Sequence, residues 1–363
     1  MNEHEVLSYR LLDADTEAFR RIRSLSPTIS RRKELTHNLR FMAKYKYDSY
    51  EVYSAGKRFL PSLLEWLSQF RKNGEKEAGL IIVRELLFLS RTEMQELSRV
   101  TYQNILLEMM DEIIRVQGLN RFDYATAFDR LDPFLEKCVF IGMSDGAQID
   151  YFRRHSGGKI RNEQAVPYYK VDEEEKQFHS KARYAFLLED MCGSGTTFLR
   201  TENAHGRINI VGQFPRFLKK WSKFTSFDAI YYCPYLIAEK GLRRLSMLSV
   251  GPKRIVDRRR KLRFKIIPGM IIPETYSILN PHNEMFSNAE RHRIMKLCNN
   301  YYDREVEDEH TLKGGGCRFG FGGIGIFLVR YNNTPNNTPS ILWHANLAKG
   351  RKPLFRRLAR HHL

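Results

Sequence analysis

The sequence predicts an α/β protein, in which an all-helical segment precedes a largely parallel sheet. From Pro133 onward, short runs of β-branched, aromatic and aliphatic residues alternate with helical patterns. These runs are apolar on both faces, as parallel strands covered by helices are. Before Pro133, apolar residues recur every three or four positions, which is the period of a helix. We therefore expect a helical domain over residues 1–133 and an α/β domain over residues 134–363.

The helical segment contains three amphipathic runs, at residues 59–70, 78–89 and 94–116. Ser90 and Glu93 have the spacing of a capping box, so the second helix should end near Leu89 and the third should begin after Ser90. Such a pair could be a helix-turn-helix or winged-helix-like element that reads DNA. It could equally be an ordinary helical hairpin, which is the commoner structure.

Four runs after Pro133 have the length and the flanking residues of strands. They are KCVFIGM (137–143), YAFLLED (184–190), FDAIYYCPYL (227–236) and GIGIFLVRY (323–331). Helical patterns lie between them, and parallel strands need such crossover connections. The polar stretch over residues 153–183 is a candidate for a mobile loop.

The composition is that of a folded, strongly basic protein. The 363 residues are 42% hydrophobic and carry a formal net charge of +18. This balance favours a polyanionic partner, above all nucleic acid. The basic residues gather over 251–265, after Lys349, and over 215–224, where the Phe and Trp residues between the lysines could stack on bases.

Five scattered cysteines show no metal-ligand spacing, so we expect reduced thiols rather than disulfides or a zinc site. The first residues lack the basic-then-apolar pattern of a signal peptide. The apolar runs are too short and too charged to cross a membrane. We therefore expect a cytoplasmic protein with no membrane partner.

The stretch FLLEDMCGSGTTFLR (186–200) has the residues of a ligand site. It places Glu189 and Asp190 where an apolar strand should stop, and ligands of open α/β sheets collect at the carboxyl ends of strands. Residues 192–197 are small or carry hydroxyls, and TFLRTEN (197–203) should begin a helix whose N–H groups point into the turn. Such a loop can hold a phosphate. The two carboxylates would repel the phosphate, so they should face ribose hydroxyls or a magnesium ion.

An apolar strand followed by two acids and Gly-Ser-Gly-Thr-Thr resembles the phosphoribosyl-diphosphate loop of the type I phosphoribosyltransferases. The family usually has two aspartates, so Glu189 is a departure that keeps the same chemistry. The resemblance implies that Glu189 and Asp190 are the catalytic acids, that Mg²⁺ is held indirectly through Asp190, and that phosphoribosyl diphosphate or a nucleotide is the ligand. It implies ribose-phosphate binding by Cys192, Gly193, Ser194, Gly195, Thr196 and Thr197.

An earlier stretch, FIGMSDGAQIDYFRR (140–154), resembles the strand and loop that cradle pyrophosphate in this family. Its turn contains Ser144, Asp145 and Gly146. In the RRHSGGKIR stretch that follows, basic side chains would close over the pyrophosphate as the family's flexible loop does; they are Arg153, Arg154, Lys159 and Arg161. A solvated basic loop is the alternative.

The glycine-rich segment GGGCRFGFGGIGIFLVRYNNTPNNTPSILW (314–343) resembles a divergent branch of this superfamily, as does LLFLSRTEMQEL in the helical half. This branch comprises the PRTase-CE domains of bacterial conflict systems, including retron-associated effectors. The resemblance implies anti-phage defence, with a reverse transcriptase and its RNA–DNA hybrid as partners. Asn336, Asn337 and Trp343 could line a base pocket, but Asn-Thr-Pro also forms an ordinary turn, which we favour.

Three functions remain open at this point. The first is a magnesium-dependent glycosyltransferase that acts at the anomeric carbon of a ribose phosphate. The second is a non-catalytic regulator that senses the ligand on the same fold and binds nucleic acid, which the basic total and the helical half favour. The third is a scaffold with a degenerate pocket.

Overall fold

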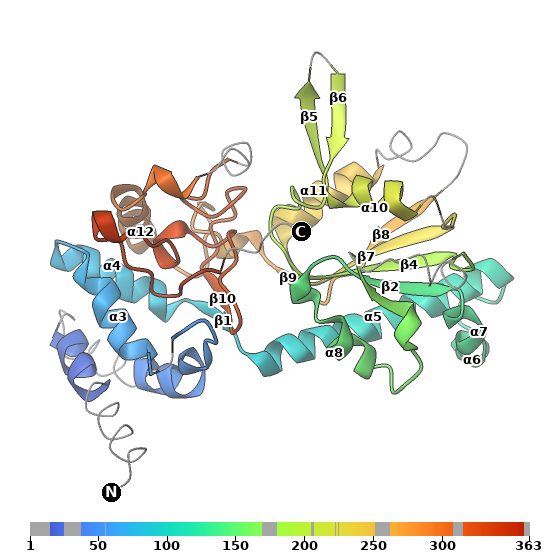
Figure 1. Cartoon of the computed structure of the whole chain (residues 1–363), viewed down its shortest axis with the longest axis horizontal. Coiled ribbons are helices and arrows are strands. Elements are labelled where there is room, and N and C mark those ends of the chain that lie inside the picture. The colour runs from blue at the N-terminus through green and yellow to red at the C-terminus, as the bar shows by residue number, and fades with distance from the viewer. Residues whose placement is uncertain are drawn as a thin grey trace, which may run out of the picture. The chain divides into compact units, whose positions relative to one another are not determined.

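The computed structural model describes residues 15–24, 38–54, 56–168, 180–204, 207–221, 223, 225–250, 262–307 and 315–358. Within these residues the chain forms two compact units (Figure 1). Unit 1 combines the residues up to Arg91 with those from Glu274, and unit 2 runs from Thr92 to Pro273. The units therefore do not follow the boundary expected at residue 133, since the segment before it is shared between them.

Unit 2 is built on a parallel sheet with the strand order β3-β2-β4-β7-β8. Its strands are β2 (Cys138–Gly142), β3 (Ala165–Pro167), β4 (Tyr184–Cys192), β7 (Ala229–Ala238), β8 (Arg263–Ile266) and β9 (Met270–Ile272). β8 pairs with the first half of β7 and β9 with its last residues. The N–H groups of Ile267 and Gly269 continue the ladder to β7 on either side of Pro268, so β8 and β9 form one interrupted edge strand.

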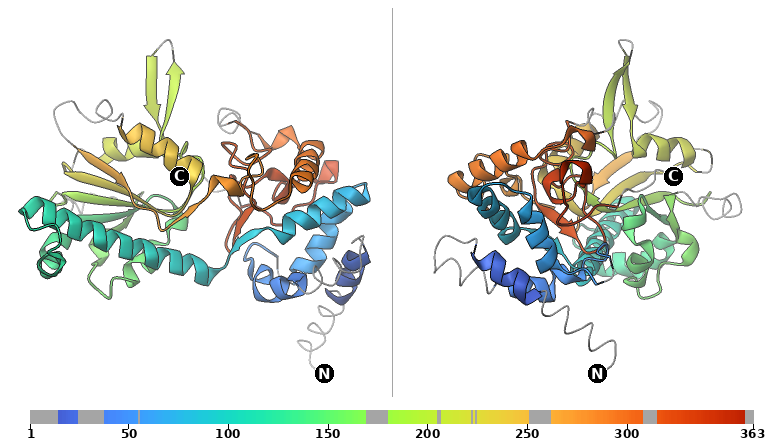
Figure 2. Two further views of the ribbon diagram at one scale, coloured as in Figure 1. Left: turned by 180° about the vertical axis from the view of Figure 1, so that it is seen from behind. Right: turned by 60° about the vertical axis from the view of Figure 1, so that its left-hand side comes forward.

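Helices cover both faces of this sheet. On one face, α10 (Gln213–Trp221) and α11 (Glu239–Val250) contribute Phe217 and Leu245 to a core with residues of β2, β4 and β7. On the other face lie α5 (Arg91–Gln117) and α8 (Ile149–Arg154), and the ring of Phe152 on α8 lies 5.5 Å from that of Phe140 on β2. Figure 2 shows the resulting layers in unit 2. The predicted α/β fold with a largely parallel sheet is confirmed.

Between β4 and α10 the chain forms an antiparallel hairpin, β5 (Arg200–Ala204) with β6 (Arg207–Val211). The prediction that TFLRTEN begins a helix was wrong, because these residues form a turn and then β5. Thr201, Ile208 and Ile210 favour a strand, and helix α10 does not begin until Gln213. Two short helices, α6 (Tyr124–Asp129) and α7 (Leu131–Leu135), lie between α5 and β2.

Unit 1 contains helical segments at residues 15–24 and 38–45, then α3 (Phe59–Ser68), α4 (Asn73–Arg84) and α12 (Asn288–Asn300). A two-stranded parallel sheet joins β1 (Leu87–Leu89) to β10 (Leu328–Arg330). The ring of Phe355 packs among five aromatic rings, those of Tyr47, Tyr50, Tyr53, Phe59 and Phe88. The core of unit 1 thus joins residues from the two ends of the described chain.

The predicted all-helical N-terminal domain is not confirmed. The run 78–89 is helical only as far as Arg84, and its last residues form β1, whose partner strand comes from far along the sequence. α5 does begin directly after Ser90, as the capping pattern predicted. However, α4 belongs to unit 1 and nearly all of α5 to unit 2, so the two helices are not parts of one helical domain.

The glycine-rich segment consists mostly of turns, with Gly320, Gly322, Gly323 and Gly325 at positive φ. Within GIGIFLVRY only Leu328–Arg330 is a strand. Unit 1 also contains short 3₁₀ helices, at Tyr47–Ser49, Glu274–Tyr276, Arg304–Val306, Ser340–Leu342 and Leu347–Lys349. All five cysteines are buried free thiols. Among the described helices, none combines the length and the apolar character needed to cross a membrane.

Candidate functional site

The strand order creates a topological switch point between β2 and β4, and we refer to the position beyond the carboxyl ends of these two strands as the crevice. The chain passes from β2 outward to β3 and then returns to the other side of β2 as β4, so the connections leave these two strands in opposite directions. Ligands of open α/β sheets bind at such a switch point, beyond the carboxyl ends of the strands. The Met143 N–H donates to the Leu188 carbonyl over 2.8 Å, which places the loop after β2 beside the last residues of β4.

The acidic pair lies near the end of β4, but not at its last residue. β4 continues to Cys192, whereas its pairing with β2 ends at Gly142 and Leu188. Glu189 and Asp190 are 7% and 2% exposed, respectively. They therefore lie on the part of β4 that extends beyond β2, next to the crevice.

Successive side chains of a strand point to opposite faces, so Glu189 and Asp190 would reach a ligand beyond β4 from its two faces. The charges of both acids act on neighbouring tyrosines of β7. Burial raises the pKa of Tyr232 most, followed by the charges of Cys192 and Glu189, and Asp190 contributes less. Burial also raises the pKa of Tyr235 most, and there Asp190 contributes more than Glu189.

The loop after β4 can form only because two glycines let it approach helix α11. Gly195 has φ of +72°, and a Cβ at this position would lie 2.9 Å from the Leu245 side chain. On the helix side, a Cβ at Gly241 would overlap the carbonyl oxygen of Gly193. A larger residue at either position would push the loop away from α11.

The polar groups of this loop are engaged with one another. The hydroxyls of Ser194 and Thr196 lie 2.7 Å apart, and the Thr196 N–H is directed at the Ser194 hydroxyl. The N–H groups at the start of α10 donate to the carbonyls of Thr197 and Phe198, so they are not available to an anion. This contact uses only one of the two hydroxyl protons, so the other hydroxyl keeps a donor for a phosphate.

Cys192 is a structural part of the loop. Burial raises the pKa of its thiol to about 12, although hydrogen bonds from Tyr232 and from the Gly195 N–H act in the opposite direction. A thiol with this pKa stays protonated and is a poor nucleophile. The side chain of Thr197, in contrast, is exposed.

The loop after β2 contains the 3₁₀ turn η2 (Asp145–Ala147). The Ser144 hydroxyl is buried and has no hydrogen-bond partner within the described residues. Gln148 follows with φ of +44°, the one non-glycine residue with positive φ in the described part of the chain. Such strained residues persist where the surroundings hold them, often at ligand sites.

Tyr235 is the residue that holds this loop. Its side chain comes from β7 and is 1% exposed, and its hydroxyl donates to the carbonyl of Ala147. The sequence analysis did not single it out. A tyrosine within a buried strand is nevertheless a signal, because its hydroxyl must find a partner inside the protein.

Comparison with protein families decides what kind of chain this is. Residues 63–357, well over half of the chain, match the family model PRTase-CE. The chain belongs to the PRTase-CE family. It is therefore phosphoribosyltransferase-like, and the match includes residues 63–133, part of the segment that was expected to form a separate helical domain. Searches of the curated proteins and of the solved structures gave no match.

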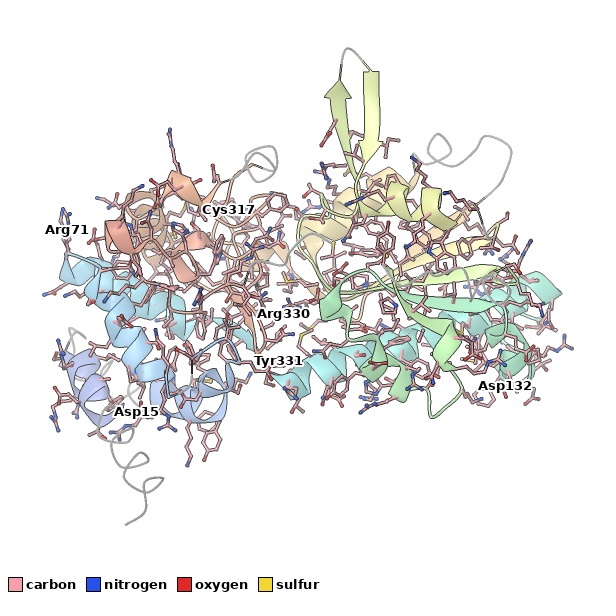
Figure 3. The ribbon with its side chains drawn as sticks, viewed as in Figure 1. Asp15, Arg71, Asp132, Cys317, Arg330 and Tyr331 are labelled. Carbon is pink, nitrogen blue, oxygen red and sulfur yellow. The ribbon has the colours of Figure 1, made fainter. Side chains whose placement is uncertain are left out.

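The basic residues expected to close over this PRTase-CE site lie elsewhere in unit 2. Arg153 and Arg154 form the last turn of α8. The Lys159 ammonium pairs with Asp132 over 3.0 Å, and Asp132 lies at the end of the unit that carries α6 and α7 (Figure 3). Arg161 pairs with Glu163. Lys159 therefore contacts α7 in this structure. The closure of these basic residues over pyrophosphate stays a prediction.

One further expectation about ligand contacts was wrong, and one was supported. Phe217 and Trp221 are buried in the core beneath α10, so they cannot stack on bases. The Trp343 indole donates to the Thr338 carbonyl and packs with Cys317 and Phe321, which makes it structural and supports the turn over the base pocket. Most of the basic run 251–265, namely residues 251–261, and the last five residues lie outside the described residues.

The described residues hold no cluster of three or more acidic, histidine or cysteine side chains suited to a metal ion. Two carboxylates, Glu189 and Asp190, nevertheless lie beside the crevice. Mg²⁺ commonly binds through one or two carboxylates together with the phosphates of a substrate. The donor set therefore fits a magnesium ion that arrives with its ligand, rather than one held by protein alone.

Proposed function

We propose that this protein binds phosphoribosyl diphosphate or a nucleotide at the carboxyl end of the unit 2 sheet and acts at the anomeric carbon of the ribose. One observation supports this above all. In a PRTase-CE chain, the acidic end of β4 and its small-residue loop lie beside a second small-residue loop at the switch point.

In this proposal Glu189 and Asp190 accept hydrogen bonds from the ribose hydroxyls, and the loop 192–197 binds the 5-phosphate. Ser144 donates its unpartnered hydroxyl to the pyrophosphate, beside Asp145 and Gly146. The bond from the anomeric carbon to the leaving oxygen breaks as an acceptor attacks. Positive charge then builds on the ring, and the carboxylates stabilise it. A magnesium ion, when bound, would neutralise charge on the departing pyrophosphate.

Calorimetry with phosphoribosyl diphosphate and MgCl₂ tests the binding. Asp190→Asn removes the charge but keeps the shape, and we expect at least about tenfold weaker binding, since a hydrogen bond to a charged group contributes about 1.5–3 kcal/mol. Asp132→Asn is the matched control, because this carboxylate is 74% exposed and pairs with Lys159 at the surface. Equal affinity of the wild type and Asp190→Asn would refute the assignment.

The closed loop favours a second candidate, a regulator that binds the ligand without turnover. The hydroxyls of Ser194 and Thr196 already contact each other, so the loop keeps its shape without a ligand. An assay for pyrophosphate release distinguishes the transferase from the regulator. Phosphorus NMR monitors the release with purine, pyrimidine, protein and nucleic-acid acceptors. Binding without pyrophosphate release from any acceptor would favour the regulator.

We further propose a cytoplasmic role in bacterial anti-phage defence, of the retron type, with a reverse transcriptase and its RNA–DNA hybrid as partners. The basic net charge of +18 and the resemblance of residues 314–343 support this context. A phage plaque assay tests it in cells that carry the wild type or Asp190→Asn. Equal plaque counts with and without the wild-type gene and its neighbours would count against the defence role.

A further inference from the structure

A cavity of about 610 Å³ opens at the amino end of the unit 2 sheet, opposite the crevice. It lies where β4, β7 and β8 begin, and three arginines line it: Arg115, Arg183 and Arg263. These residues come from α5, from the residue before β4 and from the first position of β8. Nothing in the proposed reaction at the carboxyl end uses this cavity.

Two of the arginines are fixed by one buried acid. The Glu112 side chain is 2% exposed, and it accepts a bidentate pair of hydrogen bonds from Arg263 and another from Arg115. The Tyr231 hydroxyl is also directed at this carboxylate. The buried acid therefore holds both guanidinium groups in place. The side chains of Arg115 and Arg263 are nevertheless 53% and 39% exposed, respectively.

The third arginine pairs with an acid at the surface. Arg183 donates to both oxygens of Asp228, over 2.9 and 2.7 Å. A guanidinium has five N–H donors, so each of the three arginines keeps donors beyond those bound to its carboxylate. Three guanidiniums face two carboxylates, which leaves one excess positive charge on the wall of the cavity. Such fixed, partly unused forks suit a phosphate group.

Aromatic rings complete the lining. Phe227 stacks on Phe217 of the core with ring centroids 5.9 Å apart, and Tyr184 lies 4.4 Å from Phe134 by the same measure. Both rings are therefore held in position beside the arginines. A flat base can pack against such rings or against a guanidinium plane. The volume is also within the range of about 300–1,000 Å³ that is usual for small-molecule sites.

We propose that this amino-end cavity binds a nucleoside phosphate, with the phosphate on the arginines and the base beside Phe227. The same chemistry is offered by a free nucleotide and by the 5′-phosphate end of a nucleic acid. The site is separate from the acidic crevice and does not depend on the reaction proposed there.

Calorimetry of the full chain with AMP, GMP, CMP, inorganic phosphate and the 5′-phosphorylated dinucleotide pTpT tests this. All titrations use the Asp190→Asn background, so that binding at the crevice is weakened. Arg183→Gln and Arg115→Gln keep the size and polarity of the side chain but remove its charge. Arg99→Gln is the matched control, since Arg99 lies on the same helix as Arg115, pairs with Glu96 and does not line the cavity.

We expect micromolar to millimolar binding of at least one mononucleotide, at least about tenfold weaker binding by each cavity variant, and no change with Arg99→Gln. Tighter binding of pTpT than of any mononucleotide would identify a nucleic-acid end as the source. Each cavity variant should have the same melting temperature as the Asp190→Asn protein, which would show that it folds. Failure of every probe to bind, or equal binding by the cavity variants, would overturn the proposal.

Discussion

The two ends of the unit 2 sheet differ in how their charged groups are assembled. At the carboxyl end, Glu189, Asp190 and the small-residue loop come from one continuous stretch of chain, β4 and the residues directly after it. At the amino end, the three arginines come from distant parts of the chain, at positions 115, 183 and 263. The same parallel strands thus carry an acidic end and a basic end. The first is visible in the sequence as a motif, and the second is not.

The two ends also differ in how tightly they are packed. The loop after β4 is buried against α11 and its hydroxyls bond to each other. The arginines are partly open to solvent, and two of the three rest on a buried acid. A ligand at the carboxyl end meets a tightly packed loop, whereas a ligand at the amino end meets guanidinium donors that carboxylates already orient. Four substitutions test this difference.

Glu112→Gln should have the largest effect. Removing one partner of a buried ion pair costs about 3–5 kcal/mol, and the partial exposure of both arginines brings the expected loss to about 2 kcal/mol. Urea unfolding at neutral pH measures it. A loss below about 0.5 kcal/mol would mean that the acid does not anchor the basic end.

The loss of stability in Glu112→Gln should depend on pH. Burial alone would raise the pKa of Glu112, but hydrogen bonds from Arg263 and Arg115 outweigh burial and lower it. A lowered pKa in the folded state means that the carboxylate contributes fully above its usual pKa and loses this contribution as the pH falls. The stability difference between the wild type and Glu112→Gln should therefore shrink from pH 7 toward about pH 3. A difference that stays constant would contradict this.

Gly241→Ala, at the carboxyl end, should cause the second largest loss of stability. The new Cβ would press on the Gly193 carbonyl, which belongs to the backbone and cannot rotate away, so we expect a loss of about 1–3 kcal/mol and weaker phosphoribosyl diphosphate binding. Gly74→Ala in α4 is the control, because a Cβ there meets no atom within 4 Å and should stabilise by about 0.5–1 kcal/mol. Thermal melts and calorimetry measure both. Unchanged affinity in Gly241→Ala would show that the loop does not contact the ligand.

Tyr235→Phe should cost about 1 kcal/mol, because the buried Ala147 carbonyl loses its hydrogen bond. If the loop after β2 binds pyrophosphate, the variant should also weaken pyrophosphate binding. Tyr124→Phe is the comparison, since the Tyr124 hydroxyl contacts Asp111 at the surface and should matter little. Equal effects of the two variants in chemical denaturation and in pyrophosphate titration would remove Tyr235 from the site.

Arg183→Gln should have the smallest effect on folding. Both Arg183 and Asp228 are more than 40% exposed at the side chain, and exposed ion pairs contribute about 0–1 kcal/mol. Its melting temperature should therefore match the wild type even where nucleoside phosphate affinity falls. A large drop in melting temperature would show that this end of the sheet is held together by its arginines, not merely lined by them.

Local sequence predicted much of unit 2. The apolar runs that became β2, β4 and β7 were found, because a strand buried on both faces must be apolar throughout. The start of α5 after Ser90 followed from its capping pattern. In contrast, LLFL was assigned to a helix but forms β1, since its partner strand β10 lies more than two hundred residues away and no local pattern reports that pairing.

The sequence by itself determined that an acidic pair lies at the end of a buried strand and that a glycine loop comes next, because neighbours in the sequence stay neighbours in any fold. Only the tertiary structure decided that a hairpin rather than a helix follows this loop, that Tyr235 holds the neighbouring loop, and that Phe217 and Trp221 face the core. It also decided that three distant arginines share one cavity. These outcomes depend on which surfaces meet when the strands pair, and pairing over long sequence separations leaves no local signature.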